Sequence, residues 1–152
     1  MNTVFSTSVP KGLLGEHECE ATIITCIDFR FRDATLNDFI RGHLGLRTND
    51  PLTVPGGIKG LVENDSVVAP YMRWALGVSA RLHKPRELVI VHHSTCGAYS
   101  IADAKQEFAR HAQDLQTART MLAEQFTSFQ KIRTFIANGD TEKSKIDYEE
   151  IT

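Results

Sequence analysis

The chain has 152 residues, of which 41% are hydrophobic and 24% charged, and its formal net charge is −2. These values predict one globular domain, residues 1–152, that is large enough to bury a core. The small negative charge favours neither nucleic acid nor an anionic membrane surface as a partner, and no apolar run approaches the roughly 20 residues that cross a bilayer. The N-terminal segment does not resemble a secretory signal, and three cysteines are an odd number, so we expect a cytoplasmic protein with reduced thiols.

Three β-rich segments alternate with helical patterns in the first part of the chain. Residues 21–28, 50–57 and 87–96 are predicted strands, and residues 33–46 and 62–83 are the predicted helices between them. This βαβαβ order predicts the α/β class, with a mainly parallel sheet, right-handed crossovers and helices on both faces.

The chain after Cys96 carries apolar side chains every three to four residues in a polar background, which predicts a helical C-terminal part. The side chains of this pattern are Leu115, Ala118, Leu122, Phe129, Ile132 and Ile136. The pattern fits one helix or two with a break at 113–114, and 138–139 (Asn-Gly) is a stop signal. The tail, residues 143–152, fits a short edge strand or a frayed end.

The segment "CIDFR" follows the first predicted strand. In an extended segment Cys26, Asp28 and Arg30 point to the same face. A thiol, a carboxylate and a guanidinium at a strand end are an unusual choice for packing alone. Asp28 and Arg30 can form an ion pair, which reduces the cost of burying either charge.

The third predicted strand delivers His93 and Cys96 to the same edge of the sheet, because open α/β sheets build their sites at the carboxyl ends of their strands. Taken singly, these side chains also fit a buried thiol or a core histidine. Together with Cys26, they form a set of two thiolates and one imidazole. That set favours zinc, one ion per chain, with a fourth position left for water or substrate.

A zinc ion at this edge would lower the pKa of a bound water and so produce a hydroxide nucleophile. We expect Asp28 to orient that zinc-bound hydroxide by accepting its hydrogen bond, and Arg30 to keep Asp28 ionised and correctly rotated. If Arg30 releases it, Asp28 could itself become the fourth ligand. A purely structural ion pair would have the same sequence pattern.

The two motifs, Cys26-Ile27-Asp28-Phe29-Arg30 and His93-Ser94-Thr95-Cys96-Gly97, resemble the signature of the β-class carbonic anhydrase family. The resemblance covers residues 20–110. It implies zinc bound by Cys26, His93 and Cys96, an Asp28–Arg30 catalytic dyad, and a lyase that reversibly hydrates carbon dioxide to bicarbonate. It also implies a homodimer or higher homo-oligomer.

Two alternatives remain open: a zinc hydrolase of carbonyl sulfide or carbon disulfide, and a non-catalytic zinc-binding domain of the same fold. A thiol-redox enzyme is disfavoured because the chain has no C-x-x-C motif. The remaining interpretations are structural: His92 packs under the sheet, Cys19 is a free thiol without a partner at metal-ligand spacing, Gly56 and Gly57 are turn glycines, and His17, His43 and His111 lie on the surface.

Overall fold

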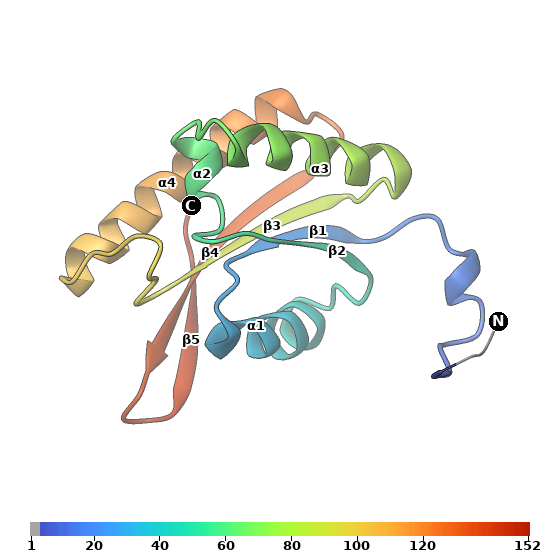
Figure 1. The fold of residues 1–152 in the computed structure, drawn as a ribbon, viewed down its shortest axis with the longest axis horizontal. Coiled ribbons are helices and arrows are strands. Elements are labelled where there is room, and N and C mark those ends of the chain that lie inside the picture. Colours follow the sequence, from blue (N-terminus) through green and yellow to red (C-terminus); the bar gives the residue numbers. More distant parts are fainter. Residues whose placement is uncertain (1–3) are drawn as a thin grey trace.

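The computed structural model describes residues 4–152, which form a five-stranded sheet with helices on both faces (Figure 1). The strand order is β2-β1-β3-β4-β5; the first four of these are parallel, and β5 runs antiparallel to β4. The strands are β1 (Ala21–Thr25), β2 (Asn49–Thr53), β3 (Glu87–His93), β4 (Lys131–Asp140) and β5 (Lys145–Glu150). The predicted α/β class is therefore confirmed.

Figure 1 shows the helix α1 on one face of the sheet and the helices α2, α3 and α4 on the other. The helices are η1 (Leu13–Gly15, a 3-10 turn), α1 (Phe29–Asp33), η2 (Ala34–His43, a π-helix), α2 (Lys59–Val62), α3 (Val68–Leu82) and α4 (Ala104–Gln125). Within residues 4–152, no helix combines the length and apolar character needed to cross a membrane.

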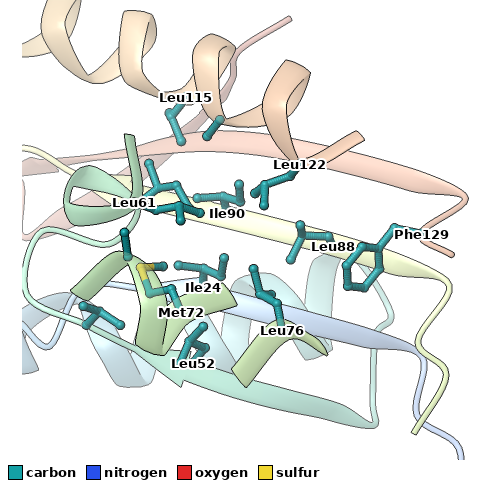
Figure 2. Close-up of a cluster of buried hydrophobic side chains, with 14 of the residues drawn as sticks. Ile24, Leu52, Leu61, Met72, Leu76, Leu88, Ile90, Leu115, Leu122 and Phe129 are labelled. Atoms are coloured by element: carbon teal, nitrogen blue, oxygen red, sulfur yellow. The ribbon is translucent and has the colours of Figure 1, made fainter. Parts of the chain in front are cut away.

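Each face of the sheet buries its own apolar cluster, because successive side chains of a strand point to opposite faces. Ile24, Leu88 and Ile90 pack against α2, α3 and α4, as Figure 2 shows. Ile23 and Val89, on the opposite face, pack against η2. Burial on both faces explains why the central strands are nearly continuous apolar runs.

The predicted strands are shorter in the structure than in the sequence analysis. The first ends at Thr25 and the third at His93, while the second covers Asn49–Thr53. The turn after β2 requires positive φ angles at Gly56 (73°) and Gly57 (61°), which confirms them as turn glycines.

The predicted helix 62–83 begins later in the structure, where it is α3 (Val68–Leu82), and the short helix α2 before it shares only Val62 with the predicted range. The break comes at Asp65, whose carboxylate accepts hydrogen bonds from the backbone N–H groups of Val67 (2.9 Å) and Val68 (2.8 Å). Such bonds satisfy donors that have no partner inside the helix, so they start α3 at this point. The other predicted helix, 33–46, corresponds to η2 with ends shorter by a few residues.

The helical C-terminal part extends only to Gln125, and α4 runs through 113–114 without a break. The helix prediction for Phe129, Ile132 and Ile136 is wrong. Ile132 and Ile136 lie in β4, and 138–139 lies inside this strand instead of ending a helix. A spacing of four residues fits one face of a strand as well as one face of a helix, so the pattern could not separate them. The tail forms the edge strand β5.

We expect Ile90→Ala to lower the free energy of unfolding by about 2–5 kcal/mol, because it leaves a cavity in the fully buried cluster on β3. Urea denaturation of both proteins measures the difference. The matched control is Val67→Ala, at a side chain that is 75% exposed, which should change the free energy by less than about 0.5 kcal/mol. Equal losses in both variants would contradict the core position of Ile90.

Candidate metal centre

The site lies where β1 and β3 end side by side. The two strands are parallel neighbours with Thr25 opposite Val91, so Cys26 leaves β1 next to the last residues of β3. His93 is the final residue of β3, and Cys96 follows after a turn in which Thr95 has a φ of +57°. The structure therefore brings together the three predicted metal ligands, all of which are buried.

The donor atoms of Cys26, His93 and Cys96 lie within 4.8 Å of one another. The two sulfur atoms are 3.9 Å apart, too far for a disulfide and close to the about 3.8 Å expected for two thiolates on one tetrahedral zinc ion. The His93 Nδ1–H donates to the Ser94 carbonyl at 2.9 Å, so in the neutral imidazole the free lone pair is on Nε2. This Nε2 is buried and has no hydrogen-bond partner within residues 4–152. Two thiols and a free imidazole lone pair fit a soft metal ion.

The charge state of the cluster also suits a cation. The hydrogen bond between Cys26 Sγ and Cys96 Sγ lowers the pKa of Cys26 despite burial and raises that of Cys96. A further donor, the backbone N–H of Gly56, lies 3.3 Å from Cys26 Sγ. Burial opposes protonation of His93, but the Cys26 thiolate and the Ser94 carbonyl raise its pKa overall. The cluster thus holds a thiolate in a buried position, which a metal ion would neutralise.

Asp28 and Arg30 pair directly, although not in the predicted way. The extended segment in which they would share a face does not exist, because β1 ends at Thr25 and Arg30 belongs to α1. Asp28 instead caps α1 by accepting from the Arg30 backbone N–H at 3.0 Å. The Arg30 guanidinium donates to both carboxylate oxygens, from Nε at 3.0 Å to Oδ1 and from Nη2 at 2.6 Å to Oδ2.

This pairing keeps Asp28 ionised beside the metal ligands. The hydrogen bonds from Arg30 hold the pKa of Asp28 at about 2. Asp28 Oδ2 lies 3.9 Å from His93 Nε2, the atom that lacks a partner. Arg30 also donates from Nη2 to the Thr95 carbonyl at 3.3 Å, so one guanidinium contacts both motifs.

A pocket of about 340 Å³ opens beside this cluster. Its polar lining is Cys26, Asp28 and Arg30, and the remainder is Ile27, Phe29, Pro55, Gly97 and Ala98. Ile27 is 56% and Phe29 81% exposed. The carboxylate and one candidate ligand therefore face a mostly apolar space that a small uncharged molecule could enter.

Glu107 of α4 is a part of the site that the sequence analysis missed. Its buried carboxylate accepts from the backbone N–H of Thr95 through Oε2 and of Cys96 through Oε1, each at 2.8 Å. These bonds hold the turn that carries the second thiol. No spacing in the sequence points to this contact, because it depends on how α4 packs on the sheet.

Two histidines form a buried layer behind the ligands. His92 is buried as predicted, whereas the prediction that His111 lies on the surface is wrong, because it is 1% exposed. His92 Nε2 accepts from the Ile58 backbone N–H at 3.2 Å, so we assign its proton to Nδ1, which donates to His111 Nδ1 at 3.0 Å. Burial lowers the pKa of both histidines. A Cβ on Gly57 would lie 2.9 Å from His92 Cδ2, so this layer also requires glycine at 57.

The comparisons with known proteins agree with this geometry. A family model described as "Putative carbonic anhydrase" matches residues 16–147. An uncharacterized protein of Rickettsia conorii is 31% identical over 138 residues, which cover 82% of this chain and 70% of the relative.

Two solved structures share the fold. A carbonic anhydrase from Glaciozyma antarctica matches with a TM-score of 0.56 and 15% identity, over 90% of this chain and 84% of that one. A mutant form of the β-carbonic anhydrase CafD of Aspergillus fumigatus matches with a TM-score of 0.56 and 14% identity, over 88% of this chain and 90% of that one. Taken together with the family match, the fold shows that this chain is a divergent member of the carbonic anhydrase family and has the β-class architecture.

Proposed function

We propose that the protein catalyses the zinc-dependent, reversible hydration of carbon dioxide to bicarbonate. The observation that carries this proposal is the unpartnered Nε2 of His93 within the Cys26–His93–Cys96 cluster, 3.9 Å from an ionised Asp28 carboxylate. These three ligands would hold one zinc ion per chain. Zinc, when bound, lowers the pKa of the water it coordinates and so supplies a nucleophile at neutral pH.

Asp28 is proposed to orient the attacking oxygen. Because its pKa is about 2, Asp28 is a carboxylate throughout the neutral range and can only accept a hydrogen bond. An oxygen whose O–H donates a hydrogen bond to Asp28 Oδ2 keeps its proton and has a lone pair free for attack, and the carboxylate fixes the direction of that lone pair. Arg30 positions Asp28 through both of its oxygens and restrains the carboxylate from rotating onto the metal.

The apolar part of the pocket suits carbon dioxide. Ile27, Pro55 and Ala98 line it together with the polar groups. Carbon dioxide has no charge, so it needs little more than apolar contacts to lie beside the nucleophile. The bicarbonate product carries a charge, and Arg30 lies at the same opening, where it can attract an anion as the product leaves.

We also propose that the protein is cytoplasmic and that it self-associates. The site needs Cys26 and Cys96 as reduced thiols, which is how the structure has them, and this supports the cytoplasm as the compartment. Self-association, as a homodimer or larger, is supported by the exposed apolar side chains Ile27 and Phe29 at the pocket.

We expect Asp28→Asn to reduce carbon dioxide hydration by at least about 100-fold while the zinc content is unchanged, because the amide cannot replace an ionised acceptor and Asp28 is not a ligand. Stopped-flow hydration and metal analysis on the same zinc-loaded sample measure both. The matched control is Asp33→Asn at the other end of α1, where the carboxylate is 74% exposed and pairs with Arg32; it should retain full activity. Full activity in Asp28→Asn would disprove the proposed role.

Substrate choice is tested on the wild-type protein with the same metal content. The turnover rates on carbon dioxide, carbonyl sulfide and carbon disulfide are measured under the same conditions and compared. The proposal expects carbon dioxide to be the fastest. Turnover of a sulfur analogue without carbon dioxide hydration would identify a hydrolase, and no turnover of any of them would identify a non-catalytic zinc domain.

We expect a graded loss of zinc affinity at this site. Glu107→Gln should weaken binding by about 10–100-fold, because one backbone N–H of the Thr95–Cys96 turn then faces an amide NH₂ group. Cys26→Ser should weaken it further, since it removes a ligand. Competition with a chromophoric chelator measures both affinities. Glu124→Gln, an exposed position on the same helix, is the control and should match wild type. Wild-type affinity in Glu107→Gln would show that the turn does not need this carboxylate.

A further inference from the structure

A second group of metal-ligating side chains lies at the opposite edge of the sheet. Cys19 precedes β1, Asp50 lies in β2, and His83 follows the last residue of α3. One donor atom from each lies within 4.8 Å of the others. No local sequence pattern relates Cys19 to Asp50 and His83, because they lie 31 and 64 residues away along the chain. The sheet brings them together: β1 and β2 begin side by side, and the Cys19 backbone N–H donates to the His83 carbonyl at 2.9 Å.

Hydrogen bonds from neighbouring side chains hold the Asp50 carboxylate in place, as is usual for carboxylates that bind metals. The Ser79 hydroxyl donates to Asp50 Oδ2 at 2.6 Å. Ser79 is itself hydrogen-bonded to the Thr22 hydroxyl at 2.7 Å, and both of these side chains are buried. Outer contacts of this kind orient a ligand before the metal arrives.

The other two donors are accessible. His83 Nδ1 lies 2.9 and 2.8 Å from the two oxygens of Asp50, and its side chain is 47% exposed. Cys19 is partly buried and lines a surface pocket of about 370 Å³. An ion from solvent can therefore reach the sulfur without any movement of the core.

The charges favour a divalent cation. One thiolate, one carboxylate and one neutral imidazole would balance a divalent cation, so the site would be neutral when filled. The mixture of sulfur, nitrogen and oxygen ligands suits zinc and its chemical neighbours better than calcium or magnesium.

We propose that Cys19, Asp50 and His83 form a second zinc-class metal site, separate from the Cys26–His93–Cys96 cluster. On binding, the Cys19 thiol loses its proton to solvent. The proton that His83 Nδ1 donates to Asp50 in the structure is exchanged through solvent for one on Nε2, so that Nδ1 can bind the metal. The ion joins the segment before β1 to β2 and to the end of α3. The proposal does not depend on the proposed function, because it uses none of the same residues.

The first test isolates Cys19 spectroscopically. The chain has three cysteines, so in the Cys26→Ser, Cys96→Ser double variant the sole thiol is Cys19. Titration of this variant with Co²⁺ should produce thiolate-to-cobalt charge-transfer absorption that saturates at one ion per chain. Adding Cys19→Ser should abolish it, and adding His83→Gln should weaken binding at least tenfold. Adding His43→Gln, at an exposed histidine elsewhere on the surface, should change nothing. Absence of this absorption in a folded double variant would overturn the proposal.

The second test uses the wild-type thiols. Equilibrium dialysis with Zn²⁺ should give one ion per chain fewer for Cys19→Ser than for wild type, which is one against two when the Cys26–His93–Cys96 cluster is also filled. Circular dichroism confirms that both proteins are folded. Zn²⁺ should also raise the melting temperature of the double variant, and Cys19→Ser should remove that increase, because a ligand stabilises the state that binds it. One ion per chain in both wild type and Cys19→Ser would reject the second site and leave the proposed catalytic centre unaffected.

Discussion

The in-register parallel pairing of β1 with β3 is the constraint that positions every part of the site. Thr25 lies opposite Val91, so the chain leaves β1 beside the last residues of β3, and Cys26 meets His93. β3 continues past the end of β1 and pairs there with β4, with His93 opposite Ala137, which supports the backbone that carries the imidazole. Because strand side chains alternate between faces, a slip of one residue would turn His93 away from Cys26.

The turn that carries Cys96 is held from both faces of the sheet. From the side of α1, Arg30 donates to the Thr95 carbonyl, and from α4, Glu107 accepts from the backbone N–H groups of Thr95 and Cys96. Asp28 links this arrangement to the backbone, since it caps α1 with the same carboxylate that receives the Arg30 guanidinium. The residues of the proposed chemistry are therefore also the residues that start a helix and restrain a turn.

The two edges of the sheet present related donors in different environments. At the carboxyl edge the donors are buried and a carboxylate lies beside them, next to a largely apolar pocket, which suits reaction with a small molecule. At the edge where the parallel strands begin, the donors of Cys19, Asp50 and His83 are partly exposed, and the carboxylate is itself one of the donors. This arrangement suits a metal site that links helices and strands to one another. The same topology produces both, because parallel strands gather their beginnings at one edge and their ends at the other.

The α/β class, the candidate ligand set and the Asp28–Arg30 pair could all be predicted from the amino-acid sequence, because they are encoded in short segments. These are the apolar strands and the two motifs, each with its polar residues a few positions apart. The sequence could not separate strand from helix at Ile132 and Ile136, since a spacing of four fits both, and β4 is a strand because it pairs with β3. Three contacts became visible only in the folded chain. Glu107 accepts a hydrogen bond from the backbone of the Cys96 turn, and His111 is buried against His92. The donor atoms of Cys19, Asp50 and His83 lie close together. These contacts join residues that no local pattern relates, and the packing of helices on the sheet sets their distances.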